Sequence, residues 1–232
     1  MKRSQQPELM DDPSSDLQAL RETLEGFRLI NRLFSRMGSL TEKYICKDIL
    51  KRGLKCVTIV DLGAGSGELC IDFIKWCRKQ NINVKAICID LDSRVVEFGK
   101  EYTADYKEIV FIEANALAVD LSEFKPDYIV SNHFLHHLSD DEIVYVLKQS
   151  FKAARFAVLF NDLQRSRIAY ILYTIVIRLF YNKGFLYEDG RLSIKRGFNV
   201  EELKTIINSA KLKGSMNVGS MLPFRVYLHS NQ

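Results

Sequence analysis

The sequence predicts an α/β fold, a doubly wound and mostly parallel seven-stranded sheet with helices on both faces. Three observations predict it. Short apolar runs rich in β-branched residues alternate with amphipathic helical segments along most of the chain. The first such run ends in a glycine-rich loop that leads directly into a helix. The 232 residues, 47% of them apolar and 27% charged, suffice for one domain with a buried core.

The chain begins with a polar segment that precedes the first helical pattern. Residues 1–16 carry two prolines and no apolar signal-peptide core, so we expect a flexible N-terminus. Residues 17–52 place apolar side chains at spacings of three and four, which predicts two helices with a break near Gly38-Ser39. We expect these helices to cap a single domain formed by residues 17–232.

The predicted strands are short runs bounded by turn residues. In chain order they are residues 57–62, 84–90, 109–113, 127–131, 156–160, 217–220 and 224–229. Helices are predicted between them at residues 66–80, 94–102, 139–154 and 199–209. Ser139 and Glu142 form a capping box, and Asn199 with Glu202 caps the last helix. Because ligands of such sheets bind beyond the carboxyl ends of the strands, we expect a site there.

The strongest motif follows the first predicted strand, where residues 59–68 read IVDLGAGSGE. Glycines let the chain turn sharply and let a ligand approach the backbone, and the helix start supplies free N–H groups. A dinucleotide fingerprint would need a glycine where Glu68 stands, and a phosphate loop would need Gly-Lys-Ser/Thr. A nucleophile elbow would need glycines at Ala64 and Glu68. The loop therefore disfavours a nicotinamide oxidoreductase.

The D-x-G-x-G-x-G pattern of this loop resembles the first motif of class I S-adenosylmethionine-dependent methyltransferases. The resemblance implies a Rossmann-like methyltransferase fold with S-adenosylmethionine as the cofactor. It also implies a set of cofactor-binding residues at the carboxyl ends of the first four strands. They are Asp61, Gly63, Ala64, Gly65, Gly67, Asp90, Leu91, Asn115, Ala116 and Asn132.

Two of these assignments have alternatives in the residues themselves. An acid about twenty residues past the glycines can accept both ribose hydroxyls of an adenosyl group. Its position at the end of the second strand favours Asp90 for this role, and Asp92 fits the N-cap of the next helix. Asn115 is either an adenine contact or a simple turn residue, and the sequence leaves both open.

The fourth strand leads into residues 127–138, DYIVSNHFLHHL, which resemble the ubiquinone/menaquinone-biosynthesis-like small-molecule methyltransferases. His133, His136 and His137 are candidates for one general base, because imidazole titrates near neutral pH. The alternative is that His136 and His137 are structural residues under the cofactor, bonded to the backbone. No Cys or Glu ligand accompanies them at a known spacing, so no metal is predicted.

Residues 163–196 fall outside the regular alternation and are predicted to form a helical lid insertion. Within them, residues 168–181 are apolar and aromatic, but shorter than the roughly 20 residues that span a bilayer. Insertions at this place in the methyltransferase fold cover the acceptor, so Tyr170 and Tyr173 are predicted to contact it. Core packing of the same stripe, and contact with a membrane surface through residues 168–181, are the alternatives.

The sequence thus predicts an enzyme that transfers a methyl group from S-adenosylmethionine to a small, aromatic or hydrophobic acceptor, with oxygen as the favoured atom. The alternatives are an RNA or protein methyltransferase and a non-catalytic S-adenosylmethionine-binding module. Nucleic acid is not expected, because no Pro-Pro-aromatic run follows Ser131 and the basic residues are spread along the chain. Five scattered cysteines, with no signal peptide and no membrane span, predict a cytoplasmic protein.

Overall fold

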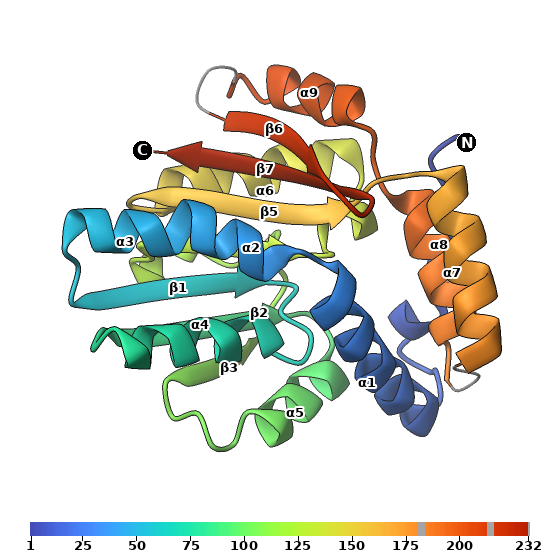
Figure 1. Ribbon diagram of the computed structural model, residues 1–232, viewed down its shortest axis with the longest axis horizontal. Helices are drawn as coiled ribbons and strands as arrows, with labels where there is room; N and C mark the ends of the chain where they lie inside the picture. The colour runs from blue at the N-terminus through green and yellow to red at the C-terminus, as the bar shows by residue number, and fades with distance from the viewer. Residues whose placement is uncertain (181–183, 213–215, 232) are drawn as a thin grey trace.

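A seven-stranded sheet with helices on both faces dominates the computed structural model, which describes residues 1–180, 184–212 and 216–231 (Figure 1). The strand order is β3-β2-β1-β4-β5-β7-β6. The first five strands in this order are parallel, whereas β7 runs antiparallel to both β5 and β6. The predicted doubly wound, mostly parallel sheet is therefore confirmed.

All seven predicted strands are present. They are β1 (Cys56–Leu62), β2 (Asn83–Asp90), β3 (Ile109–Glu113), β4 (Tyr128–Asn132), β5 (Ala157–Leu163), β6 (Met216–Met221) and β7 (Arg225–Asn231). The largest shift is in β5, which continues to Leu163 because β7 pairs with it along its whole length. The strand β1 lies between β2 and β4, at the point where the winding of the chain reverses.

Helices fill the connections and precede the sheet. They are α1 (Leu17–Phe34), α2 (Met37–Thr41), α3 (Lys47–Arg52), α4 (Glu68–Lys79), α5 (Ser93–Tyr102), α6 (Asp140–Ala153), α7 (Arg167–Phe180), α8 (Leu186–Arg196) and α9 (Val200–Ser209). A π-helical turn, η2 (Glu42–Cys46), joins α2 to α3, and 3-10 turns form η1 (Leu9–Asp11), η3 (Leu121–Phe124) and η4 (Leu135–His137). Both predicted caps form, Ser139 with Glu142 and Asn199 with Glu202.

The first helix ends earlier than its sequence predicts. The break lies at Ser35-Arg36 rather than at Gly38-Ser39, and Arg36 adopts a left-handed conformation with φ of 60°. Arg225 donates a hydrogen bond to the carbonyl of Phe34, and Asn161 donates one to the carbonyl of Ser35. Donors from the sheet therefore satisfy the last carbonyl groups of α1, which local sequence cannot reveal.

The two faces of the sheet bury separate hydrophobic cores. Ile59 of β1 packs in one core with α2, α3, α4 and α5, whereas Val60 packs in the other with α6 and α9. The alternation follows from the period of two in a strand. Because helices cover both faces of the sheet, the strands are held in place, and their carboxyl ends can position the side chains of a site.

The carboxyl ends of the central strands face α1, α7 and α8, which stand beyond them in Figure 1. The predicted lid insertion is a pair of helices, α7 and α8. Residues before α1 were expected to be flexible, but they follow a defined course against α8. The N–H groups of Leu9 and Met10 donate to the carboxylate of Asp189, and Arg196 donates to the carbonyl of Gln6.

The described residues contain no helix that combines the length and the apolar character needed to cross a membrane.

Candidate active site

The glycine loop between β1 and α4 has the geometry of a ligand-binding turn. Gly63, Gly65 and Gly67 have φ values of 66°, 55° and 74°, a region that side chains disfavour. A Cβ added at Gly65 would meet nothing within 4 Å, whereas one at Gly63 would lie 2.7 Å from Cδ2 of Phe134. A Cβ at Gly67 would lie 2.9 Å from Cζ of Phe111. Gly65 is thus the glycine that leaves open space, and the other two permit close packing.

The end of β2 is tied to this loop through Asp90. The backbone N–H of Gly65 donates to Oδ2 of Asp90 at 3.0 Å. Asp92 instead caps α5, accepting from the N–H of Arg94 at 2.8 Å and pairing with its guanidinium at 2.6 Å. Of the two predicted alternatives, Asp90 lies against the loop and Asp92 is the helix cap.

A second carboxylate, Asp61, lies one residue before the end of β1 and has an unsatisfied oxygen. Its side chain is buried, and Oδ1 has no hydrogen-bond partner among the described residues. Burial and the nearby charge of Asp90 raise the pKa of Asp61 to about 8. A buried oxygen without a partner is costly, so this position favours a ligand that brings a cation or a donor.

A cavity of ≈ 1520 Å³ opens over the carboxyl ends of the strands. Pockets for one drug-sized ligand hold about 300–1,000 Å³, so this one can hold two molecules side by side. Most residues predicted to bind the cofactor line it, namely Asp61, Gly63, Ala64, Gly65, Asp90, Leu91, Asn115, Ala116 and Asn132. Gly67 lies outside this lining and packs against Phe111 instead.

Two amide side chains on the cavity wall also have local partners. Asn115 accepts from the N–H of Leu117 at 2.8 Å, the bond expected of a turn residue. Asn132 accepts from Nδ2 of Asn161 at 2.8 Å, which joins the ends of β4 and β5. Both residues therefore shape the wall by holding their loops.

The glycine-loop region also matches known proteins. A family model described as a methyltransferase domain matches residues 59–155, from β1 to just after α6. A putative S-adenosyl-L-methionine-dependent methyltransferase from Methanococcus maripaludis superposes with a TM-score of 0.62 at 13% identity, covering 94% of this chain and 95% of that one. Residues 59–155 thus match a methyltransferase domain, and the fold of the chain is similar to that of S-adenosylmethionine-dependent methyltransferases.

Further comparisons agree with this family. The chain is 24% identical over 158 residues to the ubiquinone/menaquinone biosynthesis C-methyltransferase UbiE of Rickettsia prowazekii, over 60% of this chain. That match spans 62% of the relative, less than two thirds of its length. Magnesium protoporphyrin IX methyltransferase of Synechocystis, with bound S-adenosylhomocysteine, superposes with a TM-score of 0.52 at 12% identity, covering 79% of this chain and 78% of that one.

The cofactor of this methyltransferase family fits the residues that are present. The open space at Gly65 admits a ligand against bare backbone, and the unpaired oxygen of Asp61 suits the ammonium group of a methionine moiety. Asp90 has the place of the acid that accepts ribose hydroxyls at the end of the second strand. The fold thus brings most of the residues that were predicted to bind S-adenosylmethionine together on the wall of one cavity.

Of the two lid tyrosines predicted to contact the acceptor, one lines the cavity. Tyr173 lies on the cavity wall, and its hydroxyl donates to the carbonyl of Leu186 at 2.6 Å. Tyr170 does not line the cavity, because its hydroxyl accepts from Arg191 and its ring lies beneath Lys195. The other residues that α7 contributes to the wall are Ala169, Leu172, Val176 and Ile177. Tyr181, at the end of the apolar run, lies outside the described residues.

Among the three predicted histidines, His133 is paired with a cation. It has a φ of 61°, and its Nε2 lies against the guanidinium of Arg225, which also donates to the carbonyl of Phe34. Burial and the charge of Arg225 hold the pKa of His133 well below its usual value. The geometry therefore gives His133 a structural contact between β4 and β7.

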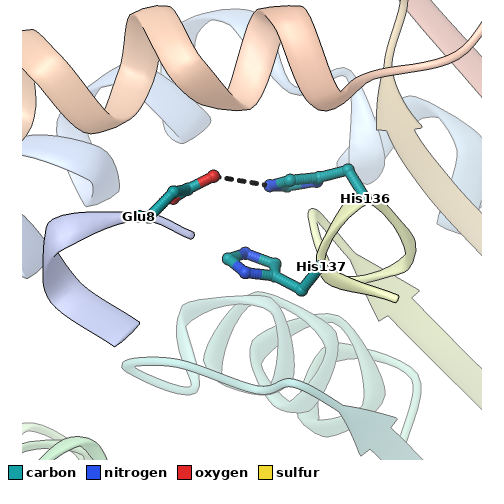
Figure 2. A group of neighbouring side chains, drawn as sticks. All are labelled: Glu8, His136 and His137. Atoms are coloured by element: carbon teal, nitrogen blue, oxygen red, sulfur yellow. Dashed lines mark ion pairs between the residues drawn. The ribbon is translucent and has the colours of Figure 1, made fainter. Parts of the chain in front are cut away.

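The other two histidines, on turn η4, are held by carboxylates. Nδ1 of His136 lies 2.7 Å from Oδ1 of Asp162, and Nδ1 of His137 lies 3.3 Å from Oδ2 of Asp11. Burial opposes the charging of His136, but the charge of Asp162 outweighs it and raises the pKa to about 9. His136 also approaches Glu8 of the N-terminal segment, as Figure 2 shows.

Sequence reasoning missed the partners of these histidines. Glu8 and Asp11 come from the segment expected to be flexible, and Asp162 lies at the end of β5. Their separation from η4 along the chain leaves no spacing pattern. The only local signal is η1 itself, where Glu8 and Asp11 form a capping box in an otherwise polar segment.

Proposed function

We propose that this methyltransferase transfers the methyl group of S-adenosylmethionine to an oxygen of a small, hydrophobic acceptor. The observation that carries the proposal is one continuous cavity, lined by the glycine loop on one side and by apolar side chains of α1 and α7 on the other. The bound cofactor supplies a methyl group already activated by the sulfonium. The protein has to align the acceptor in line with that methyl and exclude water.

The side chains opposite the loop favour an apolar acceptor. Leu24 and Phe27 of α1 line the cavity, as do Leu172, Val176 and Ile177 of α7. Binding sites of this kind orient an apolar ligand with a few polar groups. The name of the Rickettsia relative, a ubiquinone/menaquinone biosynthesis methyltransferase, supports a lipophilic aromatic compound.

Polar groups of the same wall favour a hydroxyl as the reacting group. His136 and His137 line the cavity, and in each ring Nδ1 is held by a carboxylate, so Nε2 is the nitrogen left for other partners. A hydroxyl must lose its proton as the methyl arrives, and groups on this wall can assist that loss. Methylation at carbon is the second candidate, favoured by the name of the C-methyltransferase relative.

The outer face of α7 supports contact with a membrane surface. Ile168, Ile171, Ile175 and Leu179 are each more than half exposed, and residues 167–180 contain two arginines and no acidic residue. Helices that lie in a membrane interface combine such an apolar face with basic side chains that meet anionic headgroups. Leu172 and Val176 of the same helix line the cavity, so we propose that a lipophilic acceptor enters from an anionic lipid surface.

The decisive experiment is a methyl-label screen of the purified chain. Labelled S-adenosylmethionine is offered with phenols that carry alkyl chains of increasing length, with short polar phenols, with RNA and with protein. We expect label in the apolar phenols, with an ether carbon identified in the product by NMR. Label confined to RNA or protein would contradict the proposal, and a ring-methylated product would establish the carbon alternative.

A further inference from the structure

The N-terminal segment brings a carboxylate against the two histidines of η4. Figure 2 shows Glu8 reaching toward His136, with the ring of His137 beneath it. Glu8 and His136 are each only 3% exposed. Oε1 of Glu8 lies 3.5 Å from Nε2 of His136. These three side chains meet at the cavity wall.

The hydrogen bonds of the cluster engage Nδ1 of each histidine ring and leave Nε2 available to a ligand. Asp162 holds Nδ1 of His136 and Asp11 holds Nδ1 of His137, so each ring directs Nε2 away from its carboxylate. Nε2 of His136 is buried and has no hydrogen-bond partner among the described residues. A histidine that ligates a metal almost always donates its other ring N–H to a carboxylate or carbonyl, and both rings show this arrangement.

The distance between Glu8 and His136 matches the spacing of two ligands on one metal ion better than the length of a hydrogen bond. At 3.5 Å the pair is longer than an ordinary N–H···O hydrogen bond. Two ligands of one tetrahedral zinc ion, with bonds of about 2.0–2.1 Å, lie about 3.4 Å apart. One ligand atom from each of Glu8, His136 and His137 lies within 4.8 Å of the other two. Small side-chain rotations would bring all three onto one ion.

We propose that Glu8, His136 and His137 form a binding site for a divalent metal ion of the Zn²⁺ class. Two imidazoles and one carboxylate are a ligand set that zinc accepts, and three protein ligands leave a coordination position open. All three side chains line the cavity, so the open position faces the acceptor space. This proposal departs from the sequence-based prediction of no metal, which rested on the absence of a Cys or Glu ligand at a known spacing.

The role of this metal site rests on the proposed function. The site narrows the class of acceptor to compounds whose hydroxyl can coordinate a metal ion. Coordination lowers the pKa of the hydroxyl, whose proton leaves to water. The oxygen then forms its bond to the methyl carbon with one of its electron pairs. The carbon–sulfur bond breaks with its electrons remaining on sulfur, which gives the neutral thioether.

The test measures zinc binding directly, without the acceptor. The full chain carrying Cys56→Ser, which removes the exposed thiol, is stripped with a chelator and titrated with Zn²⁺ in a calorimeter. We expect one site per chain. Glu8→Gln and His137→Gln should each weaken it by about tenfold or more, because each removes one of three ligands. Asp12→Asn is the matched control, a carboxylate of the same segment outside the cluster, and should bind zinc normally.

Binding of S-adenosylhomocysteine by each variant verifies that it is folded, because none of the substituted residues belongs to the glycine loop or to the acids Asp61 and Asp90. Zinc binding that Glu8→Gln and His137→Gln leave unchanged would overturn the site. A stripped chain that methylates its acceptor at the full rate would overturn the role of the metal, and one of the histidines would then act as a base by itself. Either result leaves the proposed methyl transfer intact, whereas a zinc-binding chain that methylates no small molecule would refute that function alone.

Discussion

Asp162 holds His136 through two atoms at once. Its Oδ2 accepts the backbone N–H of His136 at 3.0 Å and its Oδ1 accepts Nδ1–H at 2.7 Å. Both side chains are almost fully buried, and the positive charge near Asp162 keeps the pKa of that carboxyl far below its usual range despite burial. One carboxylate at the end of β5 therefore sets both the position of turn η4 and the orientation of the ring.

Replacing this carboxylate should destabilise the fold. Asp162→Asn keeps the shape of the side chain but loses the charge that both bonds to His136 use. We expect the free energy of unfolding to fall by about 1.5–3 kcal/mol, as for buried hydrogen bonds to a charged group. Urea denaturation followed by circular dichroism measures it. Asp120→Asn, at an exposed N-cap, is the control, and an equal loss in both variants would contradict the special role of Asp162.

The open space at Gly65 predicts a selective loss of cofactor binding. Gly65→Ala puts a methyl group where the cofactor backbone contact is expected. Gly53 is a matched control, because its φ of 65° is similar and its added Cβ would also meet nothing within 4 Å. Both substitutions should cost about 1–2 kcal/mol of stability through their backbone conformation. Calorimetry should show weakened S-adenosylhomocysteine binding for Gly65→Ala only, and equal binding by both variants would refute the loop assignment.

The raised pKa of Asp61 predicts that cofactor affinity depends on pH. Below about pH 8 the free protein keeps Asp61 protonated, whereas the ammonium group of the cofactor favours the carboxylate. Affinity for S-adenosylhomocysteine should therefore rise between about pH 6.5 and about pH 8, by at most tenfold per unit. Asp61→Asn should flatten this rise. A slope that survives the substitution would assign it to another group.

The same pKa has a consequence for stability of the free protein. Because the folded-state pKa of Asp61 lies above its unfolded value of 3.8, ionisation favours the unfolded chain. The contribution of Asp61 to stability is therefore present below about pH 4 and is lost as pH rises to about 8. Compared with Asp61→Asn in urea melts, the natural chain should lose stability across this window.

The exposed face of α7 predicts binding to anionic vesicles. Leu179 is 71% exposed, and Leu179→Asp should lower the fraction of protein that sediments with phosphatidylserine vesicles by about tenfold or more. Leu50 on α3 is 54% exposed and lies away from the cavity lining, so Leu50→Asp is the matched control. Equal sedimentation of both variants, or equal binding to neutral phosphatidylcholine vesicles, would contradict the proposed surface.

Local pattern was sufficient for most of the elements and for the cofactor side of the site. The alternation of strands and helices, the capping box at Ser139 and the glycine loop each depend on residues within a few positions of one another. The positions of Asp61 and Asp90 could be predicted because the sequence marks the carboxyl ends of the two strands that carry them. Parallel strands then bring these ends to one edge of the sheet, because the connections are helical and one-handed.

The acceptor side was decided by tertiary structure. Whether Tyr170 or Tyr173 meets the cavity depends on how α7 rotates against α8, and Arg191 captures Tyr170. Sequence by itself determined the sheet, the loop and the positions of the acids that we expect to bind the cofactor, because those features arise from neighbouring residues. Only the folded chain decided that Glu8 and Asp162 meet His136, because such contacts depend on which strands and segments become neighbours in space.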